Sequence, residues 1–205
     1  MTQKTSTKET IGIIAWGAMA DVLYATPIVH QIRQMHPEAD ISWLIRDKFA
    51  EVVETNPDVD HVVQFTLPEG HDSRQDAEYI MDDIIRVYAT QEYSKVYDLQ
   101  YWPRHSNFYE RPSEDFIALR ARNAGLEPPV DRKIVLECTP ADLQATADFL
   151  HENDIAKLED KFITVNHISY AASPVWSPEN YQLLVVELES RGIKSVFTGA
   201  PNEPI

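Results

Sequence analysis

The chain has 205 residues, of which 43% are hydrophobic and 25% are charged, and its net charge is -15. This length allows one large domain, or one domain and part of a second, with a core that needs no disulfide staples. The acidic balance argues against nucleic acid as a partner, because nucleic-acid-binding proteins present a basic face to phosphates. No apolar run approaches the roughly 18 residues of a membrane span. The polar start, residues 1–10, has no apolar signal-peptide segment behind it, so we expect a cytoplasmic protein.

Short apolar runs alternate with helical patterns along the first 100 residues. Runs typical of buried strands, and the helical patterns between them, are expected in this order: strand 11–16, helix 21–35, strand 40–45, helix 47–56, strand 61–65, helix 72–91, strand 95–100. Pro27 lies inside the first helical pattern. Either the helix begins there with Thr26 as its cap, or a turn from Asp21 runs into a kink.

Beyond residue 100, a loop precedes a helix at 114–124, which Ser113 caps and Gly125 ends. The remaining elements are expected in this order: strand 132–138, helix 140–153, strand 161–167, helix 178–191, strand 194–199. The single cysteine, Cys138, falls in the first of these strands, so we expect a buried, inert thiol.

Strands separated by helices of this length predict an α/β fold with a doubly wound parallel sheet, Rossmann-like. The polar stretch at 151–160 is the best candidate for a boundary. We therefore expect a first domain over residues 1–157. Residues 158–205 then form an incomplete second Rossmann-like βαβ segment. That segment either extends the first sheet or belongs to a longer, two-domain protein.

The motifs of several common enzyme classes are missing. After the first strand the chain reads Gly17-Ala18-Met19-Ala20-Asp21, which is neither the G-x-G-x-x-G dinucleotide fingerprint nor a P-loop. There is no G-x-S-x-G nucleophile elbow, and the seven histidines have no strong metal spacing. We expect no cofactor and no metal.

An ordered set of short motifs resembles a known family. The motifs are Asp21-Val22-Leu23, Thr26-Pro27, "HPEADISWL" (36–44), Phe49, "NPDVD" (56–60), "YDLQ" (97–100) and "VWSPENYQLLVVELESRGIKSVFTGAPNE" (175–203). Together they resemble the N-terminal domain and the start of the second domain of the ADP-heptose:lipopolysaccharide heptosyltransferases, glycosyltransferase family nine. The resemblance spans residues 11 to 203.

This resemblance implies a GT-B fold, in which the first Rossmann-like domain holds the acceptor sugar and the second holds a nucleotide-sugar donor. It implies sugar transfer with inversion and without a metal, to an anionic glycan acceptor of lipopolysaccharide biosynthesis. Acceptors of this family are membrane-embedded lipids, which implies transient contact with the inner membrane. The net charge of -15 gives that contact no electrostatic support. The sequence predicts no oligomeric state.

Asp21 matches the family's proposed catalytic base. At the carboxyl end of the first strand it would face the crevice where ligands of such sheets bind. There it could take the proton of an attacking acceptor hydroxyl. The alternative is a helix N-cap, which stabilises a helix by about 1 kcal/mol.

The loop "QYWPRHSNFYERP" (100–112) is rich in aromatic and arginine side chains, which suit stacking on sugar rings and bidentate binding of anionic groups. A structured surface loop is the alternative. The candidate acceptor-binding residues are Tyr101, Trp102, Arg104, Arg111, Arg46 and Lys48.

The resemblance places donor binding at Trp176 and Gly199. The chain departs from the family by having Ala20 where the family has glycine, and Pro174 and Val175 where a lysine is common. These departures favour an alternative function, a non-catalytic carbohydrate-binding or interaction protein that retains the fold but lacks the donor site.

Overall fold

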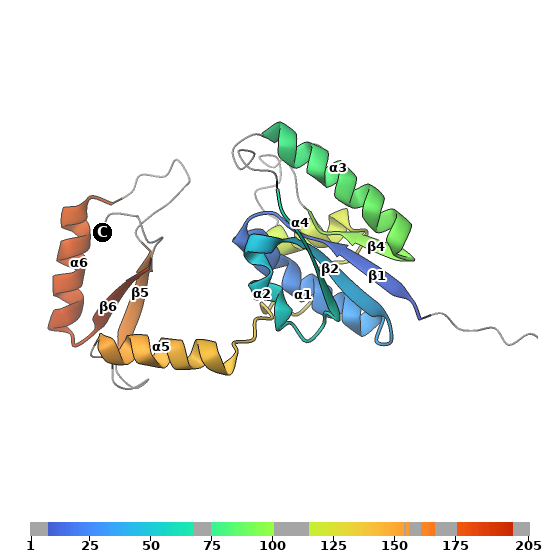
Figure 1. Ribbon diagram of the computed structural model, residues 1–205. Helices are drawn as coiled ribbons and strands as arrows, with labels where there is room; N and C mark the ends of the chain where they lie inside the picture. The colour runs from blue at the N-terminus through green and yellow to red at the C-terminus, as the bar shows by residue number, and fades with distance from the viewer. Residues whose placement is uncertain are drawn as a thin grey trace, which may run out of the picture. The chain divides into compact units, whose positions relative to one another are not determined.

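The structure is a computed structural model that describes residues 8–67, 75–100, 115–153, 155, 161–166 and 176–198. The chain divides into two compact units, residues 1–138 and 139–205, and each is considered by itself below (Figure 1). The expected domain limits, 1–157 and 158–205, stay a prediction.

The first unit is a four-stranded parallel sheet with helices on both faces. Its strands lie in the order β3-β2-β1-β4, and every neighbouring pair is parallel. The elements are β1 Thr10–Ile14, α1 Met19–Met35, β2 Asp40–Arg46, a 3-10 turn η1 Asp47–Phe49, α2 Glu51–Glu54, β3 His61–Phe65, α3 Gln75–Glu92, β4 Lys95–Asp98 and α4 Phe116–Asn123. The expected doubly wound α/β fold is confirmed.

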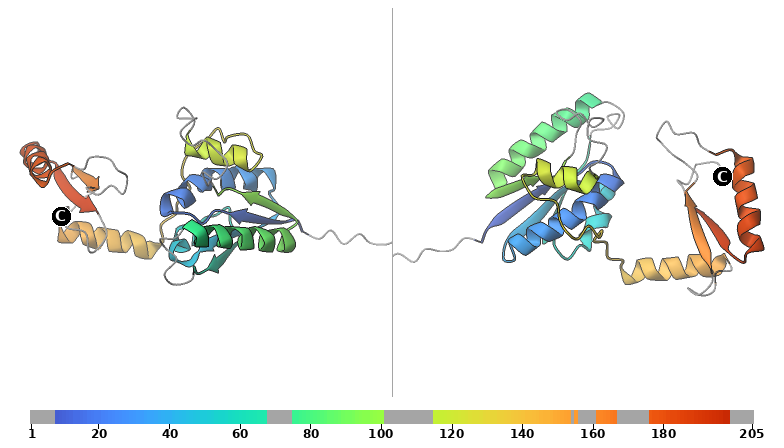
Figure 2. Two further views of the ribbon diagram at one scale, coloured as in Figure 1. Left: turned by 90° about the horizontal axis from the view of Figure 1, so that it is seen from above. Right: turned by 180° about the vertical axis from the view of Figure 1, so that it is seen from behind.

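Successive side chains of β1 enter two separate cores, because neighbouring residues of a strand point to opposite faces. Ile11 and Ile13 pack with α1, α2 and α4, whereas Ile14 packs with α3. Figure 2 shows α1 and α4 on one side of the sheet and α3 on the other. Burial on both faces explains why the strand reads as a continuous apolar run.

Helix α1 continues through Pro27, so neither a helix start nor a break occurs there. Proline has no N–H for the carbonyl of residue i−4, which here is Leu23. The hydroxyl of Thr26 donates to that carbonyl instead, at 2.8 Å, and accepts the N–H of Val135 at 3.0 Å. A neighbouring side chain thus supplies the hydrogen bond that the proline removes.

The expected fifth strand at 132–138 is wrong, since the segment has no strand structure. Its backbone bonds helix and loop side chains rather than a neighbouring strand. The N–H of Val135 donates to Thr26, and the carbonyl of Glu137 accepts from Thr55 at 2.7 Å. Cys138 is exposed, which corrects the expected buried thiol.

Asp115 is the N-cap of α4, and its carboxylate accepts the N–H groups of Ile117 and Ala118 at 3.0 Å each. The expected cap, Ser113, lies outside the described residues. The expected stop is confirmed: Gly125 has a φ of 74°, the left-handed conformation in which a helix commonly ends.

The second unit contains a two-stranded parallel sheet, in which Phe162–Asn166 pairs with Lys194–Thr198. Its elements are α5 Pro140–Glu152, β5 Phe162–Asn166, α6 Pro178–Ser190 and β6 Lys194–Thr198. These confirm the expected strand, helix and strand after residue 160, and the helix that Thr139 caps. In the part of the chain that the structure describes, no helix has the length and apolar character needed to cross a membrane.

Candidate functional site

The strand order identifies one position in the first unit where a ligand is expected. From β1 the chain moves through β2 to β3 on one side, and β4 then returns to the other side of β1. In open α/β sheets, ligands bind outside the carboxyl ends of the strands at such a topological switch point. Here that point lies between the ends of β1 and β4, where Trp16 to Asp21 and Leu99 to Gln100 follow the two strands.

Asp21 lies in the first turn of α1, three residues after the N-cap, which is Ala18. Ala18 has no side-chain oxygen to bond the free N–H groups of the helix start. Asp21 Oδ2 instead accepts the backbone N–H of Ala18 at 2.9 Å. Asp21 is therefore not the N-cap, although it performs half of a capping box. Its side chain is 36% exposed, so solvent reaches part of it.

Gly17 leaves the space that the Asp21 carboxylate occupies. A Cβ atom placed on Gly17 would lie 2.5 Å from Asp21 Oδ2 and 3.1 Å from Asp21 Cγ. Both distances are shorter than ordinary contacts between heavy atoms. The glycine after β1 is thus required by close approach of a carboxylate.

Arg120, on α4, holds the other oxygen of Asp21. Its guanidinium donates from one terminal nitrogen to Asp21 Oδ1 and from the other to the carbonyl of Leu99 at 2.7 Å. The side chain is 1% exposed. Sequence reasoning missed this residue. The helical spacing did indicate that Arg120 is buried, because it lies three residues after the apolar Ile117 and therefore on the same helix face.

A second network fixes the ends of β1 and β4 to each other. Gln100 Oε1 accepts the N–H of Trp16 at 2.9 Å, and Asp98 Oδ1 accepts the N–H of Gln100 at 3.0 Å. Arg86, on α3, donates to Asp98 Oδ2 at 2.5 Å and also pairs with the buried Asp82. Residues 97–100, "YDLQ", therefore hold the turn that leads to Asp21.

The charges of this second network raise the pKa of Arg86. Burial alone would lower the pKa of Arg86. The hydrogen bond and charge of Asp98, together with Asp82, outweigh burial and raise this pKa above its usual value. Arg86 is a cation with or without this shift, so it supplies a fixed positive charge beside Asp98 and Asp82.

Arg46 is the last residue of β2, and Lys48 lies in the 3-10 turn that follows at the same edge of the sheet. Arg46 is buried, and its guanidinium carbon lies 5.9 Å from the centre of the Phe49 ring. The Lys48 ammonium is exposed and lies 5.0 Å from the same ring. Both cations thus contact an aromatic face. Their predicted role in acceptor binding stays a prediction.

Most of the predicted aromatic loop lies outside the described residues, as do Tyr101, Trp102, Arg104 and Arg111. In the second unit, Trp176 is 55% exposed, and its ring centre is 5.7 Å from that of Tyr181, on α6. Gly199 lies outside the described residues. The predicted donor role of these two positions stays a prediction.

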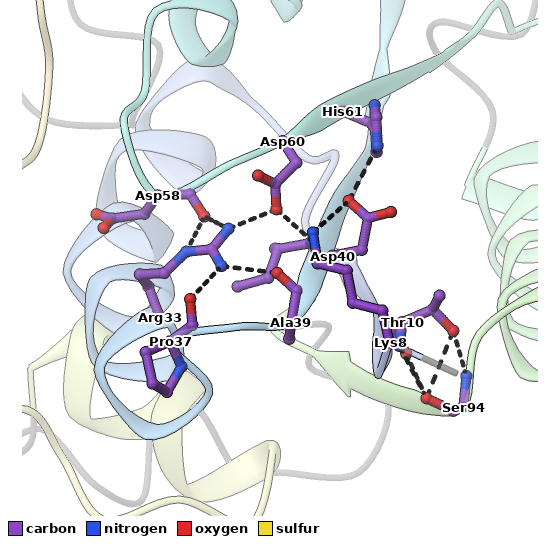
Figure 3. Close-up of polar contacts among 11 residues, drawn as sticks. Lys8, Thr10, Arg33, Pro37, Ala39, Asp40, Asp58, Asp60, His61 and Ser94 are labelled. Atoms are coloured by element: carbon purple, nitrogen blue, oxygen red, sulfur yellow. Dashed lines mark hydrogen bonds and ion pairs between the residues drawn. The ribbon is translucent and has the colours of Figure 1, made fainter. Parts of the chain in front are cut away.

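Figure 3 shows the opposite, amino-terminal edge of the same sheet, where two of the motifs of the resemblance meet. The Arg33 guanidinium donates to the carbonyls of Ala39 at 2.8 Å and Asp58 at 3.0 Å, and to Asp60 Oδ2 at 2.6 Å. The same Asp60 oxygen accepts the N–H of Ile41 at 2.8 Å. Desolvation would raise the pKa of Asp60, but these hydrogen bonds outweigh it and lower the pKa below its usual value.

The motif residues at this edge have structural roles. Asn56 Oδ1 accepts the N–H of Asp58 at 2.9 Å, which shapes the turn before β3. Asp40 Oδ1 lies 3.0 Å from His61 Nε2, and these residues begin β2 and β3 (Figure 3). Residues 36–44 and 56–60 therefore align strands at the edge that is remote from the topological switch point.

No protein-family model and no curated protein sequence matches the chain, but solved structures do. A family 9 glycosyltransferase from Veillonella parvula DSM 2008 aligns with 94% of this chain and 63% of its own length, at a TM-score of 0.68 and 18% identity. The E. coli heptosyltransferase WaaC, solved with ADP, aligns with 94% of this chain and 68% of its own length, at a TM-score of 0.57 and 16% identity. E. coli ADP-heptose lps heptosyltransferase II aligns with 94% of this chain and 65% of its own length, at a TM-score of 0.57 and 12% identity.

The chain thus spans about 63% of the length of the Veillonella enzyme. Identities of 12–18% show a shared fold rather than a shared reaction. The chain has the fold of the glycosyltransferase family 9 heptosyltransferases.

Proposed function

We propose that the protein is a glycosyltransferase that resembles the heptosyltransferases. It transfers a sugar from a nucleotide-sugar donor to an anionic glycan acceptor of the lipopolysaccharide type, with inversion and without a metal. The position of Asp21 carries the proposal. Its partly exposed carboxylate lies beside the topological switch point, and Ala18 and Arg120 hold its two oxygens.

The reaction needs a base at this place. As the acceptor hydroxyl attacks the anomeric carbon, its O–H bond breaks while the bond from that carbon to the leaving diphosphate breaks on the opposite face. A single displacement inverts the anomeric centre, and the released proton passes to Asp21. A carboxylate has about four lone-pair sites, so one protein donor on each oxygen leaves room for the acceptor hydroxyl.

The donor class is proposed from the similar structures. E. coli WaaC was solved with ADP and with ADP-2-deoxy-2-fluoro heptose. We therefore choose ADP-heptose as the first donor to assay, with a lipopolysaccharide core acceptor and the full-length protein. Asp21→Asn keeps the size of the side chain and removes the base, so kcat should fall by about 10²–10⁴. A loss smaller than about tenfold would contradict the role as base.

Asp142→Asn is a matched control, because Asp142 has the same place in α5 as Asp21 has in α1. It is the third residue of its helix, and its carboxylate accepts the N-cap N–H of Thr139 at 2.8 Å. The hydrogen bonds from the Thr139 side chain and backbone lower the pKa of Asp142. The control variant alters capping contacts with Thr139 and no candidate site residue, so its kcat should stay at the wild-type value.

The acceptor side is tested separately. We propose that Arg104, Arg111, Arg46 and Lys48 contact the anionic acceptor, as their charge and their place after the strands favour. Titration of the lipopolysaccharide core acceptor into Arg104→Ala and Arg111→Ala should give weaker binding than the wild type. Unchanged affinity in both variants would remove the loop from the site.

A second candidate function is a carbohydrate-binding or interaction protein without catalysis. Both oxygens of Asp21 already bond protein donors, as in a carboxylate with a structural role. This candidate predicts that the acceptor binds to the wild type and to Asp21→Asn with equal affinity and that neither transfers a sugar.

A further inference from the structure

Arg120 is a charged residue at a core position of α4. Its side chain is 1% exposed, and its neighbours in α4, Ile117 and Ala121, belong to the hydrophobic core with Leu99. A charge at such a position costs stability unless it is paired and hydrogen-bonded. The partners of Arg120 therefore show what the charge does.

The guanidinium fork joins two elements that meet at the topological switch point. One terminal nitrogen bonds the carbonyl of Leu99, which directly follows β4, and the other bonds Asp21 Oδ1 in the first turn of α1. The bond to the Leu99 carbonyl fixes the plane of the fork, and the fork then fixes the place of the carboxylate oxygen. Lysine is a point charge without a rigid fork and cannot reproduce this geometry.

Three contacts define the position of the Asp21 carboxylate. Arg120 holds Oδ1, the N–H of Ala18 holds Oδ2, and the bare Cα of Gly17 lies against Oδ2. Two of these contacts come from the turn itself. Within the part of the chain that the structure describes, Arg120 is the residue that ties the carboxylate to a distant segment, 99 residues further along.

We propose that Arg120 is a positioning residue that fixes the side chain of Asp21 at the topological switch point. The importance of this position for catalysis rests on the function proposed above, whereas the positioning itself does not. In a transferase, an oriented carboxylate needs no rearrangement when the acceptor hydroxyl arrives. Arg120 would thereby act on kcat through Asp21, without contact to either substrate.

The backbone amide of Ala18 reports the position of the carboxylate without any assay of activity. Its N–H bonds Asp21 Oδ2 directly. In ¹H–¹⁵N spectra of the full-length protein, Asp21→Asn should move the Ala18 amide resonance, and Arg120→Leu should move it by a comparable amount. Arg120→Lys should move it less. An Ala18 resonance that stays at its wild-type position in Arg120→Leu would overturn the proposal.

Urea unfolding adds a thermodynamic cycle with a matched control. Asp21→Asn should lower the urea midpoint in the wild type and have a smaller effect when Arg120 is already leucine, because the pair is then absent. Arg132→Leu removes an exposed arginine that pairs with Asp115, so its midpoint should change little. Equal effects of Asp21→Asn in both backgrounds would contradict the coupling.

Transfer kinetics then separate the positioning from the proposed function. Arg120→Leu should lower kcat by about 10²-fold with KM nearly unchanged. A displacement of the base by about 1 Å takes it out of line with the acceptor hydroxyl and slows the chemical step without weakening substrate binding. Arg120→Lys should recover part of the loss. Should the wild type transfer no sugar while the Ala18 amide responds as expected, the proposed function fails and the positioning stands. Normal kcat in Arg120→Leu, with a displaced Ala18 resonance, would show that the position does not matter for transfer and would refute the link to kcat.

Discussion

Gly17→Ala tests whether close approach at Gly17 sets the position of the Asp21 carboxylate. The new Cβ would lie 2.5 Å from Asp21 Oδ2. Since a Cβ atom makes ordinary contacts at 3.4 Å or more, the carboxylate must move by about 1 Å. A displacement of that size in a reacting group can lower kcat by about 10²-fold. We expect a loss of this order in the assay with ADP-heptose and a lipopolysaccharide core acceptor.

The same variant should change stability through three effects. Gly17 is not among the described glycines with positive φ, Gly125 and Gly192, so alanine can adopt its backbone conformation. Such a replacement stabilises a protein by about 0.4–1 kcal/mol through the unfolded state. Weakening the bond between Asp21 and the N–H of Ala18 costs about 1 kcal/mol. The movement of the carboxylate also weakens its pair with the buried Arg120, so the free energy of unfolding should fall below the wild-type value.

Ala20→Gly is the control for this prediction. It introduces the glycine that the resemblance implies at this place, on the exposed side of the first turn of α1. It should cost up to about 1 kcal/mol of helix stability and leave kcat unchanged. A Gly17→Ala protein that unfolds as the wild type does and keeps its kcat within about tenfold would refute the steric argument.

Two further predictions concern stability. Asp60 has a folded-state pKa below its usual value, so the stability that it contributes is present above the unfolded pKa of about 3.9 and is lost as the pH falls through the folded pKa. Asp60→Asn should therefore flatten the acid side of a plot of urea midpoint against pH, and an unchanged slope would contradict this. Thr26→Val should lower the free energy of unfolding by about 1–2 kcal/mol. The loss should be smaller in Pro27→Ala, whose new N–H can bond the Leu23 carbonyl, and equal losses in both backgrounds would contradict that account.

Periodicity located the first four strands, and the signal is clearest in β1 and β2, whose residues 11–14 and 41–45 are buried on both faces of the sheet. The edge strand β3 is only partly buried. The same signal failed at 132–138, where a run rich in apolar residues bonds the side chains of Thr26 and Thr55 instead of a strand. Pro27 likewise lies within a continuous helix because the hydroxyl of Thr26 replaces the missing N–H. Both outcomes depend on hydrogen-bond partners that local patterns do not specify.

The candidate site was predictable in part. The place of Asp21 after a buried strand indicates the carboxyl edge of a parallel sheet, and this required only the order of elements. Its detailed role needed the fold, since Ala18 rather than Asp21 is the N-cap and the pairing arginine comes from α4. The sequence pattern predicted the helix that carries Arg120, but the burial of the Arg120 side chain was not predicted.

The sequence by itself determined the alternation of strands and helices, and with it the parallel α/β sheet. Buried strands need short apolar runs, and the helices that cover them need apolar residues at helical spacing, so both can be read from the order of apolar residues. Only the tertiary structure decided which charges meet. Asp21 and Arg120 are 99 residues apart, and the contact between them depends on β4 lying beside β1. That contact is a consequence of sheet order, which brings distant residues to one edge and which no local pattern encodes.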